Sequence, residues 1–215
     1  TGGALPGQTS SGGYDVFVRQ YHRDGSVAWT DQFGTSSYDI GSGVAVSPQG
    51  TVTVTGFTGG ALPGQTSSGG YDVFVRQYHR DGSVAWTDQF GTSSYDIGSG
   101  VAVSPQGTVT VTGFTGGALP GQTSSGGYDV FVRQYHRDGS VAWTDQFGTS
   151  SYDIGSGVAV SPQGTVTVTG FTGGALPGQT SSGDRDVFVR QYHRDGSVAW
   201  TDQFGTSSWD LGYGV

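Results

Sequence analysis

Cysteine, methionine, lysine, glutamate and asparagine are all missing from the 215-residue sequence. Without cysteine the chain can form no disulfide, no cysteine-ligated zinc site and no thiol nucleophile. Cysteine and methionine are also the side chains that oxidise most readily, so their absence predicts an extracellular or cell-surface location. No apolar run approaches the length of a membrane-spanning helix, and we expect no membrane span.

Basic side chains are scarce as well. Nine arginines stand against 17 aspartates, which gives a formal net charge of −8. Nucleic-acid binding depends on basic patches that neutralise the phosphate backbone. Nucleic acid is therefore not an expected partner, and the sequence predicts neither a cofactor nor a metal site.

The residues that are abundant favour strands and turns. Glycine alone contributes 41 residues, and aromatic side chains make up 13% of the chain. Serine, threonine and valine fill much of the rest, which is typical of β-structure. Disordered chains are poor in aromatic and β-branched residues, so this composition predicts a packed all-β protein.

The sequence is a tandem repeat with a 57-residue period. Residues 1–57, 58–114 and 115–171 are identical, and a fourth, incomplete copy covers residues 172–215. We expect one repeat array over residues 1–215. Identical copies arise by recent amplification of a natural unit or by engineering, and the sequence leaves both origins open. The fourth copy differs at Asp184, Arg185, Trp209, Leu211 and Tyr213.

Each unit contains four segments with strand character. They cover residues 15–21, 26–33, 43–46 and 51–55, and several alternate between apolar and polar side chains. Tight turns at Asp24-Gly25 and at Pro48 to Gly50 alternate with two long loops, residues 34–39 and 57–71. Four antiparallel strands per repeat predict the four-stranded blade of a β-propeller.

The unit also resembles the bacterial seven-bladed β-propeller repeat family (SBBP-like repeats). The matching residues are the run 14–19 (YDVFVR), Asp24-Gly25, Trp29 with Gln32-Phe33-Gly34, the run 43–46 (GVAV), Gly50 and Gly56-Phe57-Thr58. Gln49 departs from the family, which usually has Asn or a similar turn residue there. The resemblance covers essentially the whole chain and implies a propeller of a secreted or surface protein, without a single shared activity.

By analogy with such propellers, the small strand at 43–46 lines the central channel and the Trp29 strand is outermost. The chain then starts with an outer strand pair and ends within an inner strand at 212–215. The strand equivalent to 51–55 is missing from that blade, and an open sheet edge invites pairing with another chain. We therefore expect a longer parent protein or self-association into a ring or a filament.

Short and long connections alternate, so both long loops emerge on one face of the array. Loops on a rigid scaffold often carry binding sites. The candidate ligand-binding residues on this face are Tyr38, Asp39, Tyr95, Asp96, Tyr152, Asp153, Trp209 and Asp210. The aspartates could form a cation-binding ring, but capping of each residue's own loop is favoured.

Other side chains have simpler interpretations. Trp29, Trp86, Trp143 and Trp200 lie in alternating strands and are expected to pack between blades rather than to stack on sugars. His22 and Asp24 recur in every unit with no asymmetric pocket, so we expect no catalytic residues and no enzyme. The five residues that distinguish the fourth copy are expected to adapt it to a different neighbour.

The sequence therefore predicts a structural repeat scaffold that self-assembles through its incomplete blade. The alternative is a multivalent, lectin-like propeller that binds a glycan through one weak site per blade.

Overall fold

The computed structural model describes all 215 residues and consists of strands, turns and loops, with no helix. The strands are β1 (Val16–Tyr21), β2 (Val27–Phe33), β3 (Asp39–Val46), β4 (Val52–Thr58), β5 (Asp72–Tyr78), β6 (Val84–Phe90), β7 (Asp96–Val103), β8 (Val109–Thr115), β9 (Asp129–Tyr135), β10 (Val141–Phe147), β11 (Asp153–Val160), β12 (Val166–Thr172), β13 (Asp186–Tyr192) and β14 (Val198–Phe204). The all-β prediction is confirmed.

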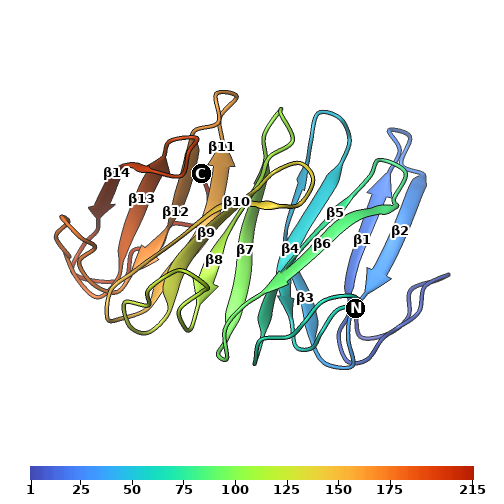
Figure 1. Ribbon diagram of the computed structural model, residues 1–215, viewed down its shortest axis with the longest axis horizontal. Coiled ribbons are helices and arrows are strands. Elements are labelled where there is room, and N and C mark those ends of the chain that lie inside the picture. Colours follow the sequence, from blue (N-terminus) through green and yellow to red (C-terminus); the bar gives the residue numbers. More distant parts are fainter.

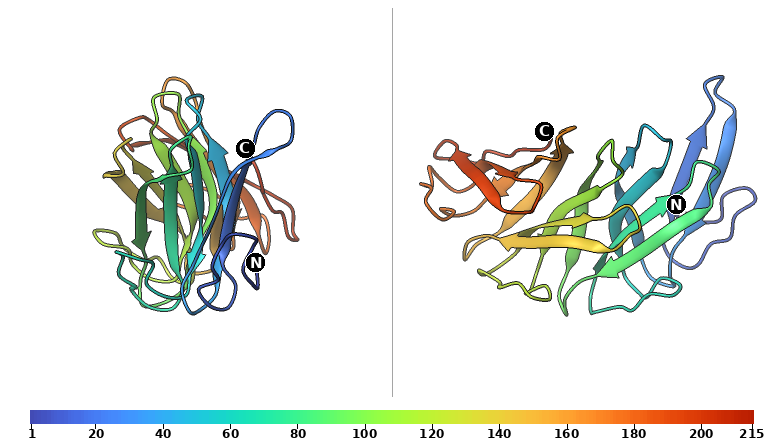
Figure 2. Two further views of the ribbon diagram at one scale, coloured as in Figure 1. Left: turned by 90° about the vertical axis from the view of Figure 1, so that its right-hand side faces the viewer. Right: turned by 45° about the horizontal axis from the view of Figure 1, so that its top comes forward.

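Twelve of the strands form three antiparallel four-stranded sheets in chain order, namely β3 to β6, β7 to β10 and β11 to β14. Strands β1 and β2 pair with each other alone. Figure 1 shows the sheets side by side along the molecule, with β1 and β2 at one end and β11 to β14 at the other. They follow an open arc (Figure 2), so the repeat of the sequence is a repeat of whole sheets.

The first strand of each sheet is longer than the sequence predicts. The prediction placed Asp39 in a loop, whereas β3 begins at Asp39, and its ladder with β4 runs from Asp39 opposite Thr58 to Val46 opposite Val52. A register shift between Gly41 and Gly43 interrupts the alternation that sequence reading relies on.

The order of strands within each sheet agrees with the predicted order. Strands β3, β7 and β11 lie close together. A Cβ on Gly43 would be 3.0 Å from the Ser99 carbonyl, and one on Gly100 would be 2.9 Å from the Ser156 carbonyl. The small residues of this strand therefore permit a close approach between neighbouring sheets. The tryptophan strands β6, β10 and β14 form the opposite edges of the sheets.

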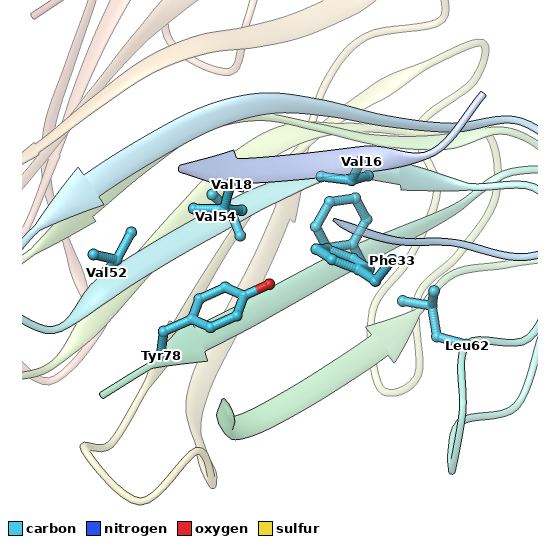
Figure 3. Close-up of a cluster of buried hydrophobic side chains, with 8 residues drawn as sticks. Val16, Val18, Phe33, Val52, Val54, Leu62 and Tyr78 are labelled. Carbon is cyan, nitrogen blue, oxygen red and sulfur yellow. The ribbon is translucent and has the colours of Figure 1, made fainter. Parts of the chain in front are cut away.

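The hydrophobic core lies between successive sheets and is repeated three times. One cluster joins the β1–β2 pair to the first four-stranded sheet (Figure 3), and the other two join the remaining sheets. Aliphatic side chains of one sheet pack there against aromatic side chains of the next. The first cluster contains Val16, Val18, Phe33, Val52, Val54, Leu62, Phe74 and Tyr78.

The last residues of the chain run along the third sheet. A Cβ on Gly212 would meet Thr169 Oγ1 at 2.6 Å, as one on Gly98 would meet Thr55 Oγ1 at 2.3 Å. Gly212 therefore occupies the place that Gly98 has in β7. The segment lies where the first strand of a further sheet would lie, but it has no strand partner.

Candidate functional site: the sheet junctions and the long-loop face

The two long loops of each unit meet at one end of the sheets, which we call the long-loop face. The Gly59 amide donates to the Tyr38 carbonyl over 2.9 Å, so the loops 34–38 and 59–71 are in direct contact. The tight turns lie at the opposite end (Figure 1). The expectation that both long loops share one face is confirmed.

A glutamine from the outer strand holds the longer loop in place. Gln89 Nε2 donates to the Gly60 carbonyl and to Asp72 Oδ2, both over 2.9 Å, and Gln89 Oε1 accepts from the Leu62 amide over 2.9 Å. Leu62 itself is buried. Sequence reasoning did not single out Gln89, because alternation along its strand gives no information about contacts with a loop.

Aromatic rings stack across each junction on this face. The Phe57 and Tyr71 rings have centroids 4.6 Å apart, and Tyr71 stacks on Tyr95 of the next sheet at 5.0 Å. The same triplet recurs as Phe114, Tyr128 and Tyr152. About half of each Tyr95 and Tyr152 side chain stays exposed, so the face presents a tyrosine at a fixed place in each of the first three repeats.

The fourth unit keeps this contact but changes its chemistry. Arg185 stands where the other units have tyrosine, and its guanidinium lies 4.2 Å from the Trp209 ring centroid and 4.7 Å from that of Phe171. The backbone geometry is unchanged, since the Asp210 amide donates to the Arg185 carbonyl over 2.8 Å. Two of the five altered residues are thus partners in one cation–π contact.

The other altered residues are less engaged. Asp184 and Tyr213 are exposed, and Leu211 is partly buried in the segment after β14. Nothing in the structure explains the change at Asp184.

The aspartates predicted to bind a ligand point inward. Asp39, Asp96 and Asp153 are buried, and Asp210 is half-buried. Asp96 Oδ2 accepts from the Thr92 amide over 2.6 Å, and Asp39 makes the same contact with the Thr35 amide. This is the loop-capping arrangement that the sequence favoured over a cation-binding ring. Only Tyr38, Tyr95, Tyr152 and Trp209 of the candidate residues are exposed.

At the outer edge of each junction, the tryptophans pack on the next sheet. The Trp29 ring stacks on Tyr78 at 5.2 Å and covers Gly82, where a Cβ would approach the indole to 2.6 Å. The Tyr78 hydroxyl donates to Asp31 over 2.7 Å, and Arg76 pairs with Asp31 at 3.4 Å. Burial and the Asp31 charge raise the pKa of Tyr78, so it stays protonated. The prediction that tryptophan packs between units is confirmed for Trp29, Trp86 and Trp143, whereas Trp200 packs on no following sheet and is 43% exposed.

Two further features are not found in the structure. No cluster of three or more histidine or aspartate side chains is arranged to hold a metal ion. The chain also has no helix that could cross a bilayer.

Comparisons with known proteins identify no single family, and no family model matches the chain. The regulatory protein FlaEY of Caulobacter vibrioides is 28% identical over 172 residues, which cover 73% of this chain and 18% of that protein. The uncharacterized WD repeat-containing protein L264 of Acanthamoeba polyphaga mimivirus is 25% identical over 198 residues, 76% of this chain and 14% of that protein. The chain spans less than a fifth of either relative.

Among solved structures, a protein of unknown function from Bacteroides caccae aligns with a TM-score of 0.34 and 11% identity, over 90% of this chain and 77% of that one. Together with the repeated sheets, the WD-repeat relative indicates a propeller-like tandem-repeat protein.

Proposed function

We propose that the chain is a structural repeat scaffold in which each four-stranded sheet is one blade of a β-propeller. Its blades join through identical junctions and present the long-loop face to the surroundings, outside the cell or on its surface. A second copy of the chain completes the assembly by adding blades at either end. The observation that carries this proposal is that aromatic side chains that are buried at the interior junctions are exposed at the two ends of the array.

The end that carries β1 exposes side chains that are buried in every other unit. Phe17 is 55% exposed and Tyr21 58%, whereas the equivalent Phe131 and Tyr135 are fully buried. We call Phe17 and Tyr21 the leading face. Exposed apolar surface beside an unpaired strand edge favours association.

The opposite end exposes the complementary side chains. Trp200 is 43% and Phe204 52% exposed, while the equivalent Phe90 is 7% exposed. We call Trp200 and Phe204 the trailing face. In the interior, Trp86 packs on Tyr135 at 5.3 Å and Phe90 on Phe131 at 5.4 Å.

The trailing face of one copy therefore offers the groups that the leading face of another copy lacks, and a head-to-tail contact would reproduce the aromatic contacts of an interior junction. Such a heterologous contact closes into a ring or grows into a filament, depending on the rotation per copy.

The test is the mass of the 215-residue chain in solution, measured by light scattering over a range of concentrations. We expect species heavier than the 22.2 kDa single chain. Phe17→Asp and Phe204→Asp should each be monomeric, because each destroys one face. An equimolar mixture of the two should form a 1:1 dimer through the remaining intact faces. Tyr38→Asp, an equally exposed position away from both faces, is the matched control.

A wild-type chain that stays monomeric at every concentration would contradict the assembly proposal. So would two monomeric variants that fail to pair when mixed. Fibres in electron micrographs of the wild-type chain would identify the filament, and a discrete oligomer the ring.

A second function is favoured by the exposed tyrosines of the long-loop face. Tyr95 and Tyr152 sit at equivalent places with their rings held by stacking. Aromatic rings stack on sugars, and several weak sites on one array gain strength from multivalency. A glycan array probed with the wild-type chain and with a Tyr38→Ala, Tyr95→Ala, Tyr152→Ala variant tests this. Binding that survives the triple substitution would reject it.

A further inference from the structure

Each sheet junction buries two aspartates beside each other. Asp72 and Asp96 are both fully buried. They flank Gly91, where a Cβ would lie 2.3 Å from Asp72 Oδ1 and 2.8 Å from Asp96 Oδ2. No basic group pairs with either of them, since the three ion pairs of the chain join Arg76, Arg133 and Arg190 to other aspartates at the outer strands.

One of the two carboxylates is only half satisfied. Asp72 Oδ2 accepts from the Ser68 amide and from Gln89 Nε2, each over 2.9 Å, but Asp72 Oδ1 has no hydrogen-bond partner. The equivalent oxygens of Asp129 and Asp186 are also without a partner. A buried charge is costly unless it is paired or fully hydrogen-bonded, so two ionised carboxylates here would repel each other without compensation.

Beside Asp96, the Thr115 hydroxyl has two possible acceptors but only one hydrogen to donate. Thr115 Oγ1 lies within hydrogen-bond distance of Asp96 Oδ1 and 3.0 Å from the Gly117 carbonyl. A hydroxyl has a single hydrogen, so Thr115 cannot donate to both oxygens. The mismatch disappears if Asp96 Oδ1 carries a proton: Asp96 then donates to Thr115, and Thr115 donates to the Gly117 carbonyl. Thr58 lies between Asp39 and Gly60 in the same way.

We infer that each junction between two four-stranded sheets binds one proton on its aspartate pair, so that Asp96 is a neutral carboxylic acid, Asp72 is the ionised partner, and the junction is an acid-tolerant, pH-sensitive joint. At the second of these junctions the equivalent acid is Asp153 and its partner is Asp129. Burial raises the pKa of Asp96 and of Asp153, and the neighbouring charges of Asp72 and Asp129 raise them further.

The direction of the pH effect follows from linkage. A carboxyl whose pKa is raised on folding stabilises the native state fully below its unfolded pKa, about 3.9, and loses that contribution as the pH rises through the folded value. The groups that face Asp96 are the charged Asp72 on β5 and the neutral Thr92 and Thr115. No cation near the pair offsets the loss, so raising the pH from about 4 through the folded pKa should loosen the junctions.

Infrared spectroscopy of the whole chain tests the proton directly, because protonated and ionised carboxyls absorb at different frequencies and the identical repeats add their signals. At about pH 5.5 an aspartate of ordinary pKa is almost entirely ionised. We expect a protonated-carboxyl band that persists there in the folded chain and vanishes on unfolding. Absence of that band overturns the proposal, as does a band that calcium abolishes while raising the melting temperature.

A matched pair of variants tests the consequence. Replacing Asp96 and Asp153 together by asparagine keeps a donor toward the threonine and removes the titratable proton. The wild-type melting temperature should fall as the pH rises above about 4, and this variant should lose that slope. Asparagine at the exposed turn positions Asp81 and Asp138 should keep it. An unchanged slope in the first variant overturns the proposal, and the infrared band decides the matter if that variant does not fold.

Discussion

Phe17 and Phe131 occupy the same position of identical 57-residue units, yet one is 55% exposed and the other is fully buried. The difference is the neighbouring sheet. Phe131 packs edge-on against Phe90 of the neighbouring sheet at 5.4 Å, whereas no sheet of the structure packs over Phe17. The same holds for Tyr135 and Tyr21.

The comparison shows that these side chains are buried by contact with the neighbouring sheet and not by their own unit. A single unit has two apolar faces and buries neither by itself. Stability of such arrays is close to a sum of unit terms and nearest-neighbour terms. Matched substitutions at an interior junction and at the leading face therefore measure the neighbour term directly, with the local sequence held constant.

The largest contrast is expected for Phe131→Ala against Phe17→Ala. Removing a buried phenylalanine costs about 3–5 kcal/mol in free energy of unfolding, while a mostly exposed one should cost less than about 1 kcal/mol. Denaturant unfolding followed by circular dichroism measures both. The Phe204→Asp background keeps association from burying Phe17. Equal losses at the two positions would show that the unit, not the junction, sets the stability.

A smaller contrast is expected for Tyr135→Phe against Tyr21→Phe. The Tyr135 hydroxyl donates to Asp88 Oδ2 over 2.8 Å, whereas Tyr21 is 58% exposed and has no such bond. A hydrogen bond to a charged group contributes about 1.5–3 kcal/mol, so Tyr135→Phe should destabilise by about that amount. Tyr21→Phe should change the unfolding free energy by less than about 0.5 kcal/mol. A loss at Tyr21 as large as at Tyr135 would contradict this account.

Much of the fold could be predicted from the sequence. The exact repeat, the alternation in 26–33 and 51–55 and the Asp-Gly turn predicted four-stranded antiparallel units with the tryptophan strand at the edge, and the structure has them. Sequence reading failed where a bulge breaks the alternation, so that β3 begins at Asp39 rather than at residue 43.

The candidate site could be predicted less well. The long-loop face and its tyrosines were identified from the order of the connections. The burial of Asp96 and the role of Gln89 were not, because both depend on contacts with segments about 17 to 29 residues away along the chain. Asp96 and Asp81 look alike in sequence, yet a hydrogen bond from the Ser83 hydroxyl lowers the pKa of the exposed Asp81, while burial raises the pKa of Asp96.

The smallest effect is expected at the one junction that differs in sequence. Arg185 and Trp209 changed together where the other units stack two tyrosines, as at Tyr128 and Tyr152. A double-mutant cycle of Arg185→Tyr and Trp209→Tyr should give a coupling energy of about 0.5–1 kcal/mol, the range of an exposed cation–π contact. Each single variant should be less stable than both the wild type and the double variant, because the double variant rebuilds the tyrosine stack. Strict additivity would mean that the two changes are independent and that this junction was not retuned as a pair.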